Sequence, residues 1–451
     1  MRKLLFGAIA FAFTAPAAAV DLMGVYELAS TNDPQIRAAE LRLESAQFSE
    51  AIAKARLLPT IDATATKTIG ESSTEIGGQV INNDVFSDDE RISVNLRQSL
   101  YDDANWANLN RARSIIAQAD AQYNIAFQDF LLRVAVRYFE ILTALDAVQF
   151  AEAEELALKR QFEQAEQRFE VGLSAVTDFL EARAAWDAAR ARVIVAENTL
   201  QNAREALREL TGESFETYKP LAEDLPFLAP EPAVPDEWVT RALNSSPELE
   251  AARQGVEIAG SDVREARAGH LPTLDLTAGY NRFIDNELLL RDDFQNIIAT
   301  TELENTGWSL GLQLNVPIFQ GGAVRSRSRQ AVFDERAAIQ DLEFQQRTTV
   351  RQTEDAFRAV MAGILEVQAL EQALISADSA LEATNAGFEV GTRTIVDVLL
   401  AEQRFFNAQR NFSQARHQFI VDNLSLERSV GTLSSDDIEQ ANAKLDGPER
   451  G

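Results

Sequence analysis

Apolar and polar residues alternate in two pairs of segments, one pair in each half of the chain. Ile92, Val94 and Leu96 are interleaved with Ser93 and Asn95. The other segments show the same two-residue period, which is typical of a strand with one apolar face. We predict four strands, at about residues 59–73, 90–101, 272–284 and 306–319. Little else in the chain alternates, so no second sheet is predicted to cover their apolar faces.

Most of the remaining sequence has the spacing of a helix. Residues 102–170 and 323–389 contain no proline, and each run predicts one very long helix. Both runs end at a Val-Gly pair, Val171-Gly172 or Val390-Gly391, where glycine can adopt the left-handed conformation that ends a helix. Helix resumes up to Gly212 and Gly431. Each half therefore predicts a long antiparallel helical hairpin next to two strands.

The two halves are copies of one unit. Asn32-Asp33-Pro34 is matched by Ser245-Ser246-Pro247, and Leu58-Pro59-Thr60 by Leu271-Pro272-Thr273, both displaced by 213 residues. The sequence predicts an internal two-fold repeat. We expect these segments: a first structural repeat at 20–219, a Pro-rich linker at 220–235, a second structural repeat at 236–433 and a C-terminal periplasmic tail at 434–451.

Lipid is the natural cover for the apolar faces of the four strands. Strands of about ten residues are long enough to cross a bilayer when tilted, with polar side chains toward a wet lumen. Residues 72–89 and 285–306 lie between the strands of each hairpin and are polar and acidic. We expect them to be exposed external loops.

Four strands are too few for a barrel with an interior, since about eight are needed, and an open sheet would expose backbone edges to lipid. Closure therefore requires several chains. Cyclic symmetry with three chains gives about twelve strands, although two, three and four subunits all remain open on this argument.

The N-terminus indicates export. Met1-Arg2-Lys3 is followed by an apolar run from Leu4 to Phe13 and by Ala17-Ala18-Ala19, as in a secretory signal peptide at residues 1–19. No later stretch approaches eighteen consecutive apolar residues, so no membrane-spanning helix is predicted. The formal net charge of -28 argues against nucleic acid and anionic lipid as partners.

The residue inventory argues against an enzyme. The chain has no cysteine and two histidines, His270 and His417, neither of which has a companion at metal-ligand spacing. We predict no catalytic residue, no metal site and no cofactor. A periplasmic coiled-coil adaptor without its own pore is the alternative function, since it too would contain long antiparallel helices.

The chain resembles the TolC family of trimeric outer-membrane export channels. The resemblance is densest from Ala386 to Leu433, through the run Gly391-Thr392-Arg393-Thr394-Ile395-Val396-Asp397, and includes the junction Val316-Pro317-Ile318-Phe319-Gln320-Gly321-Gly322. It implies a mixed α and β homotrimer in the cell outer membrane. Its 12-stranded transmembrane β-barrel, with four strands per chain, would be continuous with a long periplasmic α-helical barrel.

The same resemblance implies partners and a function. The duct would work with a periplasmic adaptor (membrane fusion protein) and an inner-membrane transporter of the ABC or RND type, in contact with outer-membrane lipid. It would export proteins by type I secretion, or drugs and small molecules by efflux. The hairpin tips would dock the adaptor through Val171, Gly172, Leu173, Ser174, Val390, Gly391 and Thr392.

The resemblance also implies a periplasmic gate. Arg393 takes the position of a latch arginine that bonds Thr177 and Asp178, and Asp397 that of a carboxylate at the lumen constriction. This chain departs from the family pattern at Phe388, which replaces a tyrosine, and at Leu400, which replaces a second aspartate. We therefore expect the latch to rest mainly on Arg393 and the constriction to carry one ring of carboxylates.

Overall fold

The computed structural model describes residues 19–76, 79–291 and 297–445, so the predicted signal peptide lies outside it except for Ala19. The chain divides into two units. Of the described residues, 19–42, 121–250 and 344–445 form the helical unit, and 43–76, 79–120, 251–291 and 297–343 form the sheet unit.

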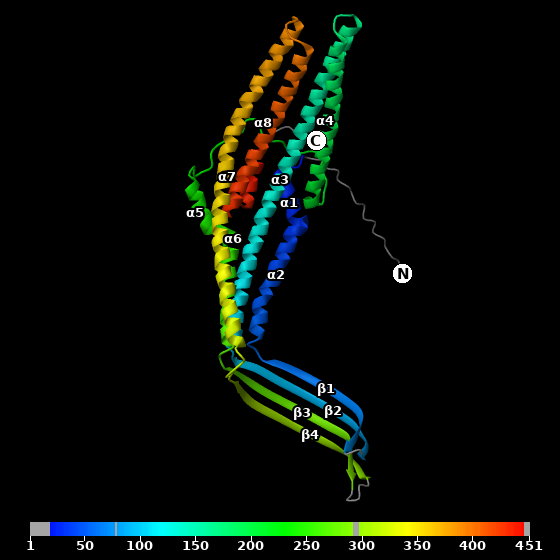
Figure 1. Cartoon of the computed structure of the whole chain (residues 1–451), viewed down its shortest axis with the longest axis vertical. Coiled ribbons are helices and arrows are strands. Elements are labelled where there is room, and N and C mark those ends of the chain that lie inside the picture. The colour runs from blue at the N-terminus through cyan, green and yellow to red at the C-terminus, as the bar shows by residue number, and fades with distance from the viewer. Residues whose placement is uncertain (1–18, 77–78, 292–296, 446–451) are drawn as a thin grey trace, which may run out of the picture. The chain divides into compact units, whose positions relative to one another are not determined.

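The sheet unit contains one antiparallel four-stranded sheet (Figure 1). Its strands follow each other in chain order: β1 (Thr60–Ile76), β2 (Gln79–Tyr101), β3 (Thr273–Arg291) and β4 (Ile297–Asn315). The register pairs Leu276 with Leu312 and Leu274 with Leu314, which places apolar residues on a common face. Trp308 is 81% exposed and Leu310 67%, so the described residues of one chain do not cover this face.

The strands are longer than the sequence predicted. β2 begins at Gln79 rather than at about residue 90, and β3 continues to Arg291 rather than 284. Most of the predicted external loops is therefore strand, and residues 77–78 and 292–296 within them lie outside the described part of the chain. The acidic side chains do not end the strands, because the hydrogen bonds between neighbouring strands join backbone N–H and C=O groups and not side chains.

The end of β4 also differs from its predicted position at residue 319. The strand stops at Asn315, two residues before Pro317. Proline has no backbone N–H to donate to a neighbouring strand, which explains the earlier end.

Helices make up most of the described chain, and they repeat with the sequence. The first copy contains α1 (Leu22–Asn32), α2 (Pro34–Ala55), α3 (Asp103–Glu170) and α4 (Val176–Thr211). The second copy contains α5 (Pro235–Ser245), α6 (Pro247–Ala268), α7 (Ala323–Glu389) and α8 (Ile395–Val430). The short helices α1 and α5 were not predicted individually, and α9 (Ser435–Asn442) follows the second copy.

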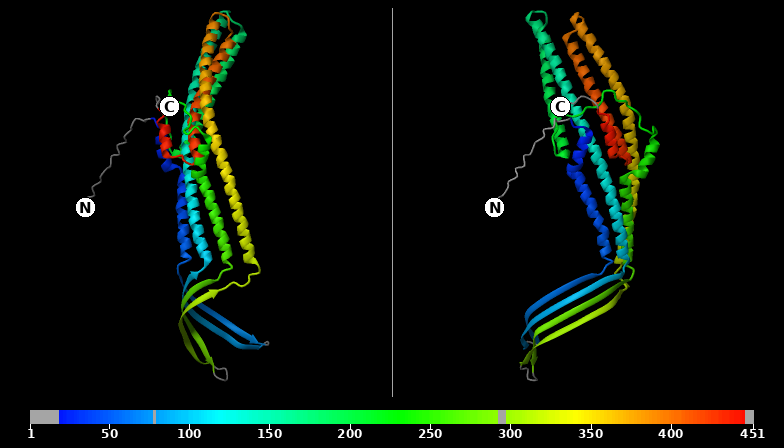
Figure 2. Two further views of the ribbon diagram at one scale, coloured as in Figure 1. Left: turned by 90° about the vertical axis from the view of Figure 1, so that its left-hand side faces the viewer. Right: turned by 180° about the vertical axis from the view of Figure 1, so that it is seen from behind.

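Two helical hairpins dominate the helical unit: α3 runs beside α4, and α7 beside α8 (Figure 2). Phe162 of α3 stacks on Trp186 of α4 at 5.2 Å between ring centroids. A Cβ placed on Gly363 of α7 would lie 3.6 Å from Phe419 of α8. Of the described helices, α7 alone is long and apolar enough to cross a membrane by length and composition. Within the described chain, 17% of that apolar stretch is buried.

Glycine ends these helices where the sequence predicts it. Gly172 and Gly391, in the hairpin turns, have φ angles of 76° and 81°. Gly212 and Gly431 cap α4 and α8 in the same left-handed conformation.

The core of the helical unit includes the two ends of the described chain. Tyr138 is fully buried, and its hydroxyl donates to the carbonyls of Lys219 and, more weakly, Val20. In α9, Ile438 is fully buried. The segment expected to be a C-terminal tail is thus packed into the core through α9.

Candidate functional site

The two hairpin turns are the candidate docking surface. In the turn between α3 and α4, Val171 is 69% and Leu173 78% exposed, and in the turn between α7 and α8 Val390 is 75% exposed. Gly172, Ser174, Gly391 and Thr392 complete the two turns. Large apolar side chains this exposed are typical of a surface that another protein covers.

The latch residues lie near these turns, but one chain does not join them. Arg393 is exposed in the α7–α8 turn, while Thr177 is exposed and Asp178 half-buried in the first turn of α4. Within the described chain, Arg393 makes no hydrogen bond or ion pair with Thr177 or Asp178. The aliphatic part of Arg393 instead packs on Gly387, where a Cβ would come within 2.8 Å of its Cγ.

Phe388 has a partner that the sequence analysis missed. The guanidinium of Arg168, near the end of α3, lies 4.8 Å from the centroid of the Phe388 ring of α7. Phe388 also packs against the buried cluster that contains Leu158 and Ile395. A cation–π contact needs only the ring face, so it does not require the missing tyrosine hydroxyl. It links the two hairpins next to their tips.

Asp397 is the third residue of α8 and forms a capping box with the N-cap residue Thr394. Its carboxylate accepts hydrogen bonds from the backbone N–H and the hydroxyl of Thr394, both at 2.9 Å. These bonds, followed by the charge of Arg393, lower the pKa of Asp397. The spacing Thr394-x-x-Asp397 is a capping-box pattern that was visible in the sequence but not used.

A buried charge network joins three helices farther from the tips. Glu154 of α3 is fully buried and lies 2.9 Å from Arg192 of α4 and 3.1 Å from Arg410 of α8. A buried carboxylate is tolerated when it is paired and hydrogen-bonded, as here. The pairing could not be predicted, because its members are up to 256 residues apart in the chain.

Glu402 of α8 extends this network. It is 5% exposed and accepts a hydrogen bond from Gln161 of α3 at 3.2 Å. Burial raises the pKa of Glu402 to about 6; the bond from Gln161 opposes this rise, and the charge of Glu154 adds to it. Oε2 of Glu402 and Oε1 of Gln161 are both buried without a partner, so protonation would supply a donor there.

We expect Glu402→Gln to stabilise the protein at neutral pH and not at acidic pH. Because the pKa is raised in the folded state, the cost of the charged carboxylate is present above about pH 6 and disappears as the pH falls below the unfolded value of 4.5. The gain at pH 8 should be on the order of 2 kcal/mol. Thermal unfolding at pH 4 and pH 8 measures it, with the exposed Glu382→Gln as control. An equal gain at both pH values would contradict this assignment.

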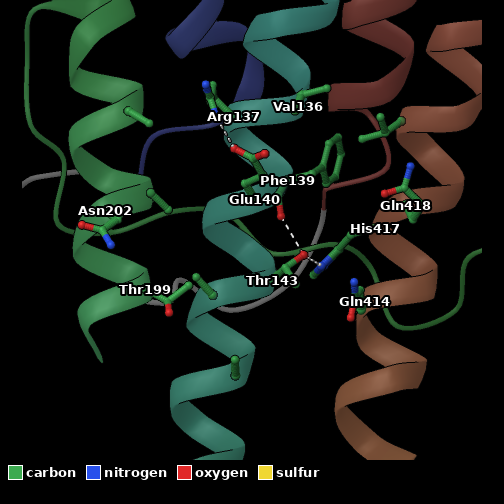
Figure 3. Close-up of a pocket in the computed structure, with 15 residues that line it drawn as sticks. Val136, Arg137, Phe139, Glu140, Thr143, Thr199, Asn202, Gln414, His417 and Gln418 are labelled. Carbon is green, nitrogen blue, oxygen red and sulfur yellow. Dashed lines mark hydrogen bonds and ion pairs between the residues drawn. The ribbon is translucent and has the colours of Figure 1, made fainter. Parts of the chain in front are cut away.

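A cavity of about 570 Å³ in the helical unit is lined by residues of α3, α4 and α8, among them His417 (Figure 3). Nδ1 of His417 lies 2.9 Å from the hydroxyl of Thr143, which itself donates to the Phe139 carbonyl. Ser413 donates to the Asp146 carboxylate, which is 4.0 Å from the other ring nitrogen of His417. The direction of the hydrogen bond between Thr143 and His417 depends on the tautomer of the imidazole, while the Ser413 hydroxyl gives its proton to Asp146. Among the described residues, no acidic and histidine cluster could hold a metal ion.

Comparison with known proteins shows the family to which the chain belongs. The family model described as outer membrane efflux protein matches residues 25–213 and 238–432. Outer membrane protein TolC of Vibrio cholerae is 39% identical over 428 residues, covering 95% of this chain and 94% of that protein. The proteases secretion protein PrtF of Dickeya chrysanthemi is 29% identical over 429 residues, covering 94% and 91%.

The fold agrees with these sequence matches. A crystal structure of CusC, at 17% identity, has a TM-score of 0.77 over 92% of each chain. Such a distant likeness shows the fold alone. Together with the two matched repeats, it identifies an outer-membrane exit duct: the chain belongs to the outer membrane efflux protein family, the family of TolC.

Proposed function

We propose that the duct is a homotrimer. The observation that carries this proposal is the open sheet. Among the described residues its edge strands β1 and β4 have no partner strand on their outer sides, and its apolar face is exposed. Pairing β4 of one copy with β1 of the next satisfies both edges and closes twelve strands around a water-filled lumen. The apolar face then meets lipid.

We further propose that the hairpin tips dock a periplasmic adaptor, which connects the duct to an inner-membrane transporter of the ABC or RND type. The exposed Val171, Leu173 and Val390 support this proposal, because they remain uncovered within the chain. The related PrtF is a proteases secretion protein, and the related TtgC of Pseudomonas putida is a toluene efflux pump outer membrane protein. Both type I secretion and efflux are therefore compatible with this duct, and neither requires catalysis by it.

The gate proposal is that Arg393 of one chain bonds Thr177 and Asp178 of a neighbouring chain. Its support is the placement of these side chains. All three lie near the hairpin tips, and in the described part of one chain Arg393 bonds neither Thr177 nor Asp178. Phe388 contributes through Arg168 rather than through a hydroxyl. Asp397 would line the constriction while it caps α8.

Cross-linking from a tip tests the docking proposal. The chain has no cysteine, so Leu173→Cys introduces a single reactive thiol. We expect a thiol-reactive cross-linker to join it to a coiled-coil periplasmic protein in living cells, identified by mass spectrometry. Leu228→Cys, 70% exposed in the linker, is the control. Cross-linking of the same protein with equal yield at both positions would contradict docking at the tips.

A further inference from the structure

A cationic cavity lies between α6 and α7 in the sheet unit. Its volume is about 550 Å³. Ser328 of α7 donates to the Ala266 carbonyl of α6 beside it, at 3.2 Å, which holds the two helices together there. The cavity is lined by Arg267, His270, Arg325, Ser328, Arg329, Val332, Phe333 and Arg336.

The four arginines of this cavity have no acidic partner among the described residues. Arg336 contacts the ring of Phe333, at 5.6 Å from its centroid. Glu335, next in sequence, points instead toward Gly260 of α6, where a Cβ would lie 3.5 Å from its carboxylate. Four clustered and unpaired guanidinium groups repel one another, so they favour an anion between them. The formal net charge of -28 makes such a cluster unusual in this chain.

An exposed apolar surface adjoins the cationic cavity. A smaller cavity of about 100 Å³ shares His270 and Arg325 with it and is lined by Ile318 and Phe319. Ile318 is 94% and Phe319 85% exposed. Ile318 continues the two-residue alternation of the lipid-facing residues of β4, which ends at Asn315. The arginines therefore lie where the apolar outer face of the sheet ends.

We propose that the cationic cavity binds the phosphate headgroup of an anionic phospholipid in the periplasmic leaflet of the outer membrane. Arginine guanidinium groups match phosphate oxygens in pairs, and Arg267 and Arg329 approach the cavity from different helices. Ile318 and Phe319 contact the upper part of the acyl chains. The net negative charge of the chain argued against anionic lipid as a partner, but the side chains that line this cavity carry positive charge. The bound lipid ties α6 to α7 at the membrane boundary.

Native mass spectrometry of the purified protein in detergent tests this proposal. Dioleoylphosphatidylglycerol and dioleoylphosphatidylcholine are titrated separately against the wild type, R267Q/R329Q and the control R264Q/R327Q. The control also removes one exposed arginine from each helix, but outside the cavity. We expect phosphatidylglycerol to bind on the order of tenfold more tightly than phosphatidylcholine in the wild type and the control. This preference should disappear in R267Q/R329Q and largely persist in R267K/R329K.

Three results would overturn the proposal. The first is equal binding of the two lipids by the wild type. The second is an equal loss of preference in the control, which would indicate general surface charge. The third is complete displacement of phosphatidylglycerol by millimolar inorganic phosphate, which would indicate a site for free anions rather than for a lipid anchored by its chains.

Discussion

Gly431→Ala is expected to destabilise the helical unit by about 3 kcal/mol, from the cost of left-handed backbone and of overpacking. Gly431 ends α8 with φ at 87°, a conformation that alanine adopts poorly. A Cβ at this position would also lie 2.6 Å from Cδ of Pro247 and 2.9 Å from the carbonyl oxygen of Ser245. Backbone atoms cannot move aside as a flexible side chain can, so the helix end must shift.

The first repeat provides a matched control. Gly212 ends α4 with φ at 74°, but the nearest atom to its added Cβ is Nδ2 of Asn32 at 4.0 Å. Gly212→Ala should therefore cost only the backbone term, about 1 kcal/mol. Thermal unfolding followed by circular dichroism compares the two variants. Equal shifts of the unfolding midpoint would show that crowding by the turn before α6 adds nothing.

Arg393→Ser is expected to move the resting channel toward the open state. Each charge-assisted bond from Arg393 contributes about 1.5–3 kcal/mol, and threefold symmetry repeats it. Since shifting a population from 1:99 to 99:1 takes about 5.5 kcal/mol, losing three such bonds is enough to change the resting state. Single-channel recording in planar bilayers should show a clearly higher resting conductance.

Two variants sharpen this experiment. Arg404→Ser removes the same charge from an exposed position of α8, the helix that follows Arg393, and should leave the conductance close to that of the wild type. Asp397→Asn keeps an oxygen that can accept from Thr394 but removes the charge, so it should reduce cation selectivity without opening the gate. Unchanged conductance in Arg393→Ser would show that Arg393 does not hold the channel closed.

Local patterns account for what was predicted of the fold. The alternation of apolar and polar residues around Ile92 and Leu312 can be recognised within each strand alone. The glycines after Glu170 and Glu389 likewise end the helices that directly precede them. The strand ends were misjudged because residues such as Asp88 and Asp89 suggested loops, whereas the ladder of β2 is held by backbone groups and includes them.

The interactions within the site depend on tertiary placement and were less predictable. Resemblance located the tips and the latch positions, yet it did not show that Arg168 covers Phe388 or that Glu154 is paired by two helices. Each contact joins residues that meet only after α3 has packed against α4, α7 or α8. The bonds of Arg393 depend on neighbouring copies and stay a prediction.

The mass of the intact assembly tests the central claim most directly. The uncovered edges of β1 and β4 require several copies, and a wide water-filled barrel requires about twelve strands. Native mass spectrometry of the mature protein, extracted from the outer membrane in detergent, should give three chains as the stable species. A stable monomer, dimer or tetramer under the same conditions would contradict the trimeric duct.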